Sequence, residues 1–132
     1  MIAIMRPGTS IKAIILERAH RYERLALRAR ANPALARTGY VIATLFMILG
    51  TLDAISTNWA LSVGGYEANG FMRTLQAWLG PLWFIPKMLL QALVAMMIIW
   101  SPNKPTIFLM ILTCAWTASV VTSNFMIAAA LS

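Results

Sequence analysis

The chain has 132 residues, of which 60% are hydrophobic and 11% are charged, and its formal net charge is +7. A soluble domain of this size is only about half hydrophobic and has about one charged residue in four, because a small domain cannot bury more apolar surface. The composition therefore excludes an ordinary soluble domain and predicts an all-α membrane protein, for which lipid is the main solvent.

The positive charge is concentrated near the N-terminus, where eight of the eleven basic residues fall within the first 38 positions. Lysine and arginine next to a membrane span mark its cytoplasmic side and attract anionic lipid headgroups. We therefore expect a membrane-surface segment rather than a nucleic-acid-binding one. The charges place the N-terminus in the cytoplasm and the C-terminus outside, across a bacterial inner membrane.

Residues 1–9 have too short an apolar run for a signal peptide and no small-residue cleavage site. From Ser10 to about Ala31 apolar residues recur at three- and four-residue steps, which predicts a helix with one apolar face. Asn32 and Pro33 are typical of a helix end. The helix is too charged to span, so we expect it to lie on the membrane surface; docking on a partner protein is the alternative. The basic residues assigned to the membrane surface are Arg18, Arg21, Arg24, Arg28, Arg30 and Arg37.

Three apolar stretches follow, at about 39–63, 81–100 and 106–131. Each reaches the roughly 20 residues needed to cross a bilayer. The sequence thus predicts a surface segment over 1–38 and a three-helix transmembrane domain over 39–132. Between the first two spans, Phe71, Leu75, Trp78 and Leu79 share one helical face, which predicts a short interfacial helix. The last two spans are joined by a tight turn at 101–105.

The most informative residue is Asp53, which lies inside the first span. A carboxylate at this depth costs about 2.5–3.5 kcal/mol on insertion scales, so it should face protein or water. Thr57 follows one helical turn later on the same face. Lys87 in the second span is a natural partner for Asp53, and Glu67 competes for the same lysine. The sequence leaves open whether Asp53 is a structural carboxylate or a proton or cation site.

The third span has no charged side chain within 106–131, but it carries Thr113, Thr117 and Asn124 at helical spacing. Small polar residues of this kind commonly form hydrogen bonds between membrane helices. We therefore expect helix contacts there rather than a substrate groove.

The stretch from Gly50 to about Leu93 resembles the DUF5658 family (domain of unknown function), small membrane proteins of bacteria and archaea. The family pattern is an intramembrane Asp, a Thr four residues later, then Gly-Gly-x-Glu-x-Asn-Pro and a Lys in the next span. The matching residues are Asp53, Thr57, Gly64, Gly65, Glu67, Asn69 and Lys87. Gly70 stands where the family has proline. The resemblance implies a membrane fold and marks a polar constellation, but it implies no activity.

Catalytic and cofactor-binding motifs are missing from the sequence. The single histidine, His20, lies in the surface segment, so the spans offer no imidazole to haem, chlorophyll or zinc. There is no Gly-rich phosphate loop and no Cys/His cluster. We therefore expect no cofactor other than bound lipid, and no enzymatic activity.

These observations predict a non-catalytic accessory subunit that packs against a larger membrane complex, such as a respiratory or photosynthetic one. The alternative is a homo-oligomeric transporter or ion-coupled carrier that uses Asp53 and Glu67. A weaker third hypothesis is a lipid-modifying enzyme based on Glu67 and Asn69.

Overall fold

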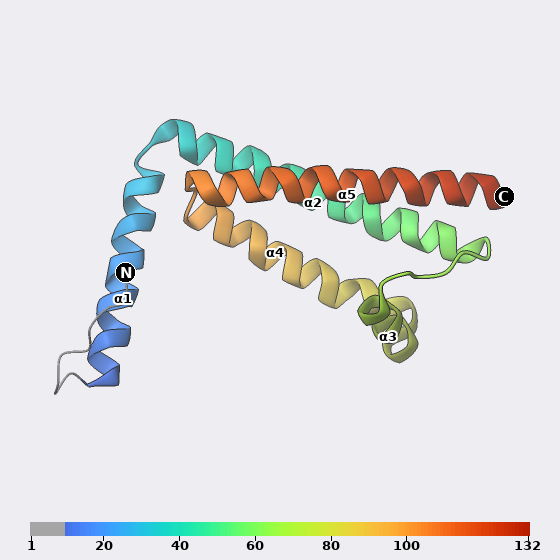
Figure 1. Cartoon of the computed structure of the whole chain (residues 1–132), viewed down its shortest axis with the longest axis horizontal. Coiled ribbons are helices and arrows are strands. Elements are labelled where there is room, and N and C mark those ends of the chain that lie inside the picture. The colour runs from blue at the N-terminus through green and yellow to red at the C-terminus, as the bar shows by residue number, and fades with distance from the viewer. Residues whose placement is uncertain (1–9) are drawn as a thin grey trace.

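The computed structural model describes residues 10–132, and within them the chain is helical with short connections (Figure 1). The prediction that no signal peptide is present falls on residues 1–9, outside the described residues. In chain order the elements are α1 (Ile11–Arg30), α2 (Pro33–Ser62), α3 (Gly70–Leu79), the 3-10 helix η1 (Gly80–Trp83), α4 (Phe84–Trp100) and α5 (Lys104–Leu131).

Three helical stretches of the described chain are long and apolar enough to cross a membrane: Pro33–Ser62, Gly70–Trp100 and Lys104–Leu131. The second of them contains α3, η1 and α4. This confirms the predicted all-α membrane protein with three membrane-crossing helices.

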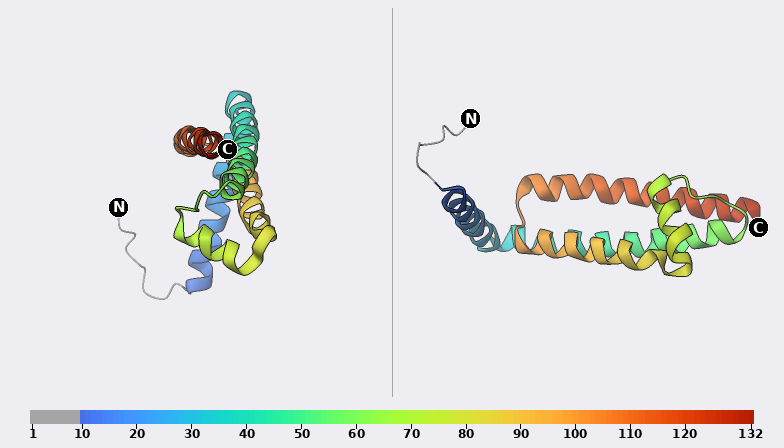
Figure 2. Two further views of the ribbon diagram at one scale, coloured as in Figure 1. Left: turned by 90° about the vertical axis from the view of Figure 1, so that its right-hand side faces the viewer. Right: turned by 90° about the horizontal axis from the view of Figure 1, so that it is seen from below.

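The first span, α2, is the central element of the molecule. It packs against α5 on one side and α4 on the other (Figures 1 and 2). The α2 and α5 helices run in the same direction. The α4 helix runs in the opposite direction and leads the chain back to the start of α5 (Figure 1). The apolar core is a cluster of buried side chains, made of Ile42, Ala43, Ala95, Ile98, Ile107 and Met110.

The two ends of the bundle differ. At the first, here called the α1 end, α1 lies across the start of α2, and α4 and α5 are joined by a short turn (Figure 1). At the opposite end, here called the far end, α3 lies across the bundle and the C-terminus is found (Figures 1 and 2). The sequence predicts a short helix at the position of α3, and the structure has one.

The helix that contains the first span begins earlier than the predicted span, at Pro33. The Asn32 side chain accepts hydrogen bonds from Ala34 N and Leu35 N at 3.1 and 3.3 Å, and Pro33 occupies the first helical turn. The same two residues therefore end α1 and start α2, because proline fits a helix start, where its missing N–H has no partner to lose. The predicted boundary between 38 and 39 consequently lies inside α2.

The turn between the last two spans is shorter than the predicted 101–105. Asn103 caps α5 by accepting from Thr106 N at 2.9 Å, and Pro105 lies in the first helical turn. The helix α5 therefore begins at Lys104, two residues before the predicted start of the third span. Pro102 is fully buried, and a Cβ at Gly39 of α2 would lie 2.9 Å from its Cβ. The turn is thus packed directly on the first span.

At the far end α2 stops in a Schellman motif built from two glycines. Gly64 has a φ of +94°, its N–H donates to Leu61 O at 3.3 Å, and Gly65 N donates to Ala60 O at 2.8 Å. A Cβ at Gly65 would lie 2.6 Å from Ala60 O. Both positions therefore require glycine, Gly64 for its backbone conformation and Gly65 for lack of space.

Candidate functional site

Asp53 and Lys87, the charged residues away from the span ends, form an ion pair. Lys87 Nζ on α4 donates to Asp53 Oδ2 on α2, and the two side chains are only 16% and 18% exposed, respectively. The ammonium also lies 5.4 Å from the centroid of the Trp83 ring. Of the two pairings that the sequence left open for Lys87, the structure has the one with Asp53. Each charge is thereby compensated inside the protein, as a charge at membrane depth requires.

One helical turn beyond Lys87, Gln91 makes a second polar contact between the same helices. Its Nε2 donates to the Phe46 carbonyl of α2 at 2.5 Å. The amide lies directly on Gly50, where a Cβ would stand 1.6 Å from Gln91 Nε2. This contact was not predicted from the sequence, although the sequence held a sign of it. Gln91 lies one helical turn after Lys87, and Gly50 lies about one turn before Asp53, so in antiparallel helices an Asp53–Lys87 pair brings Gln91 to Gly50.

A third polar contact joins α2 to α5. Asn124 Nδ2 donates to Thr57 Oγ1 at 3.1 Å and lies 3.4 Å from Ser56 Oγ. Thr57 therefore contacts α5 and not Lys87, although it shares a helix face with Asp53. Thr113 and Thr117, also expected to bridge helices, instead donate to the carbonyls of Leu109 and Thr113 in their own helix.

Glu67 and Asn69 lie apart from the ion pair, at the far end. Glu67 accepts from Asn69 N at 2.9 Å and from Gln76 Nε2 of α3 at 3.4 Å. The Asn69 side chain accepts from Phe71 N and Met72 N and so caps α3. The predicted constellation of five residues is thus divided among three places: the Asp53–Lys87 ion pair, the contact of Thr57 with α5, and the turn with Glu67 and Asn69. After α2 the glycine turn directs the chain towards α3, at the far end (Figure 1).

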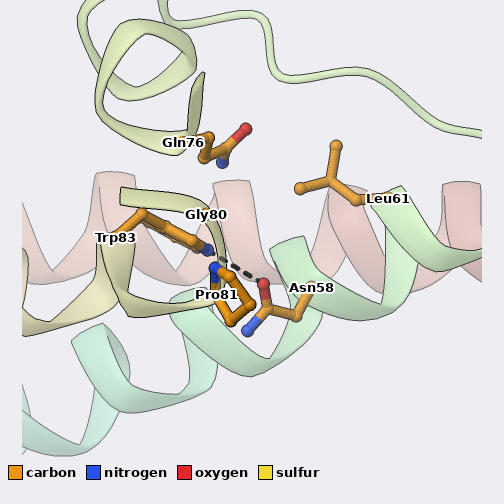
Figure 3. A pocket seen from close by; sticks show the side chains of 6 residues that line it. All are labelled: Asn58, Leu61, Gln76, Gly80, Pro81 and Trp83. Carbon is orange, nitrogen blue, oxygen red and sulfur yellow. Dashed lines mark hydrogen bonds between the residues drawn. The ribbon is translucent and has the colours of Figure 1, made fainter. Parts of the chain in front are cut away.

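An open pocket of about 420 Å³ lies at the far end, between α2 and the chain from α3 to η1 (Figure 3). Its lining consists of Asn58, Leu61, Gln76, Gly80, Pro81 and Trp83. Trp83 Nε1 donates to Asn58 Oδ1 at 3.1 Å and so fixes one wall (Figure 3). The pocket was not predicted, because the residues that line it come from three elements and share no motif.

The basic residues assigned to the membrane surface are all exposed on α1 and the first turns of α2. Arg21 lies 3.8 Å from Glu17, one turn earlier on α1. The Arg30 guanidinium lies 5.8 Å from the centroid of the Trp100 ring, at the end of α4. This contact and the packing of α1 on α2 attach the basic helix to the bundle.

Within residues 10–132, no buried side-chain nitrogen or oxygen is left without a hydrogen-bond partner. The same residues contain no group of three or more His, Cys, Asp or Glu side chains placed to hold a metal ion. The chemistry available at the site is therefore that of one compensated ion pair, several amide contacts and a carboxylate at the far end.

The profile of a family described as "Domain of unknown function (DUF5658)" matches residues 44–130. The match includes Asp53, Thr57, Glu67, Asn69 and Lys87 and leaves out α1. No curated protein and no solved structure gives a significant match. Because the match covers well over half of the sequence, the chain belongs to the DUF5658 family.

Proposed function

We propose that this protein is a non-catalytic accessory subunit whose membrane helices pack against a larger membrane complex, such as a respiratory or photosynthetic one. The observation that carries the proposal is the position of Trp116. This residue is the thirteenth of the 28 in α5, and it is 74% exposed. Tryptophan in membrane proteins is enriched at the two membrane–water interfaces, where its N–H meets polar groups. A tryptophan exposed half-way along a span suits contact with another protein helix better than contact with lipid tails.

The closed interior of the bundle also supports this role. Asp53 is engaged by Lys87, Asn124 by Thr57, and Gln91 by the α2 backbone. A carrier needs polar groups that can exchange partners with a substrate, whereas these groups bind one another. The outer surface of the spans, where Leu89, Leu93, Phe108 and Leu112 are exposed, is open to contact with other membrane helices.

The arrangement of α1 supports attachment to the cytoplasmic face of a bacterial inner membrane, with the C-terminus outside. Ala26 of α1 is fully buried, and α1 packs on α2. Ala26 lies on the same helical stripe as Ile15, Tyr22 and Leu25, which are exposed. The exposed residues of this stripe are available to lipid, which supports a position of α1 on the membrane surface. The arginines then lie among anionic headgroups, each contributing roughly 1 kcal/mol of attraction.

The test is site-specific photocrosslinking in the native membrane. A photoreactive amino acid at Trp116 of the tagged full-length chain should give adducts with larger membrane subunits. The matched control is the same group at Cys114, two residues earlier and buried, which should give no intermolecular adduct. Adducts only between copies of the chain, together with its recovery alone after gentle affinity purification, would contradict the accessory role.

An ion-coupled carrier is the second candidate, and one observation favours it. The Trp83 ring both lines the open pocket and lies against Lys87, so a ligand in the pocket would be close to the ion pair. This hypothesis predicts that proteoliposomes containing the protein dissipate a pH gradient and that Asp53→Asn abolishes the flux. Equal proton permeability with wild type, Asp53→Asn and empty liposomes would eliminate it.

A further inference from the structure

Among the four acidic residues of the chain, Glu67 is distinguished by lacking a basic partner within residues 10–132. Glu17 lies near Arg21, Glu23 near His20, and Asp53 binds Lys87. Glu67 is half-buried and accepts two hydrogen bonds from neutral groups, Asn69 N and Gln76 Nε2. Two carboxylate oxygens have about four lone-pair positions between them, so acceptor capacity remains for a ligand.

Gln76 connects this carboxylate to the pocket at the far end. Its Nε2 lies 3.4 Å from Glu67 Oε2, and the residue is part of the pocket lining, opposite Asn58 (Figure 3). The Asn58 oxygen is engaged by Trp83 Nε1, which leaves the amide N–H groups of Asn58 available as donors. One wall of the pocket therefore has the N–H donors of Asn58. The opposite wall has Gln76, which separates the pocket from the negative charge of Glu67.

A positive charge is available on α3, the helix that carries Gln76. Arg73 precedes Gln76 by three residues on α3 and so lies on a neighbouring part of the helix surface. It is exposed and takes part in no ion pair with the residues that the structure describes. Glu67 in the turn before α3 and Arg73 on α3 place both signs of charge near the start of this helix, which suits a ligand that carries both.

The surroundings of the pocket are apolar on the exposed side. Trp78, Leu79, Leu82 and Phe84 are all exposed next to it. They follow one another from the end of α3 through η1 into α4, where the chain enters its second span. A ligand with a polar head and apolar tails would be covered along its whole length, as a lipid at the membrane surface is.

We propose that this pocket binds the headgroup of a zwitterionic lipid with a primary ammonium, as in phosphatidylethanolamine. The ammonium binds beside Glu67 and the phosphate beside Arg73. A primary ammonium has three N–H donors, which match the amide oxygen of Gln76 in the lining and the negative charge of Glu67 behind it. A quaternary ammonium has none and needs an aromatic cage, whereas the one indole of this pocket already lies against Lys87. The assignment does not depend on the accessory role.

Native mass spectrometry of the purified full chain with added lipid tests the site. Phosphatidylethanolamine should be retained about tenfold more than phosphatidylcholine, and Glu67→Gln should remove most of that preference, because the negative charge behind Gln76 is lost. The matched control is Glu23→Gln, the same change on α1, which should leave retention unchanged. Leu61→Trp, which fills the pocket and keeps the carboxylate, should abolish retention as well. Circular dichroism checks that each variant is folded.

Competition with free ethanolamine identifies the source of the ammonium. Millimolar ethanolamine should displace little of the bound lipid, because the phosphate and the acyl chains contribute to binding. Displacement at that concentration would show a site for soluble amines and overturn the lipid assignment. Equal retention of phosphatidylethanolamine and phosphatidylcholine by the wild type, or unchanged preference in Glu67→Gln, would overturn the site itself.

Discussion

At the scale of single residues, Asp53 and Lys87 each lie where lipid would otherwise surround a charge, so each depends on the other. Replacing one member leaves an uncompensated charge, which costs about 3–5 kcal/mol for buried pairs in proteins. Asp53→Asn and Lys87→Met should therefore each lower the thermal unfolding temperature in detergent. The double substitution should be more stable than either single one, because no charge then remains at this depth.

The exposed pair Glu17 and Arg21 on α1 serves as the control for this cycle. Their side chains are 73% and 69% exposed, and exposed ion pairs contribute only about 0–1 kcal/mol. Glu17→Gln should leave the unfolding temperature nearly unchanged. Additive effects of Asp53→Asn and Lys87→Met would show that the two charges do not stabilise each other.

Gly50 makes a sharper prediction, because it provides the space for the Gln91 amide. Gly50→Ala would place a methyl group 1.6 Å from Gln91 Nε2 and expel the amide from its bond to Phe46 O. Overpacking of this kind costs about 1–3 kcal/mol, measurable as a lower unfolding temperature. Thr51→Ala, at the next and exposed position, should have little effect. Adding Gln91→Ala to Gly50→Ala should restore part of the loss; no restoration would place the strain elsewhere.

At the scale of elements, the start of α3 is compatible with the proline that the family pattern has at position 70. Asn69 precedes it with φ −77° and ψ 110°, an extended conformation that proline tolerates before it. Gly70 is the first residue of α3, where an N–H has no helical partner, and the nearest atom to a Cβ there is Arg73 Nη2 at 3.8 Å.

Gly70→Pro should therefore stabilise α3 by about 0.4–1 kcal/mol, because it removes freedom from the unfolded chain. Hydrogen exchange of the α3 amides should become a few-fold slower. The matched control is Gly80→Pro at the other end of α3. The φ angle there is +52°, which the proline ring does not allow. That variant should exchange faster. Faster exchange in Gly70→Pro would mean that the turn from Glu67 to Asn69 requires a glycine.

The elements themselves were largely predictable from the sequence, and some contacts between them were not. Hydropathy located the three spans, since each must be apolar for its whole length. It missed the start of α2 at Pro33, because Arg37 and Thr38 made that first turn look like part of the surface segment. Lys87 was expected to bind a carboxylate, but the choice between Asp53 and Glu67 depended on the direction of the chain after Gly65. The Gln91 contact depended on how α2 and α4 align, which hydropathy does not specify.

At the scale of the whole molecule, the charge asymmetry of the two ends predicts a single orientation. Seven basic residues from Lys12 to Arg37, together with Lys104, lie at or near the α1 end, and Arg73 lies at the far end. By the positive-inside rule the α1 end should face the cytoplasm. Alkaline phosphatase, which is active only outside the cytoplasm, should therefore be active when fused after Ser132 and inactive when fused after Asn103. The opposite pattern would reverse the topology.

The central position of α2 has a consequence for the order in which the chain enters the membrane. Lys87 belongs to the second span, and its carboxylate partner lies 34 residues earlier in the first. Because synthesis runs from the N-terminus, Asp53 is in place before the lysine arrives. The span that carries Lys87 can then enter beside a counter-charge already in the bilayer, instead of entering lipid alone. The last span follows and packs on the free side of α2, so the first span to be made is the template for the other two.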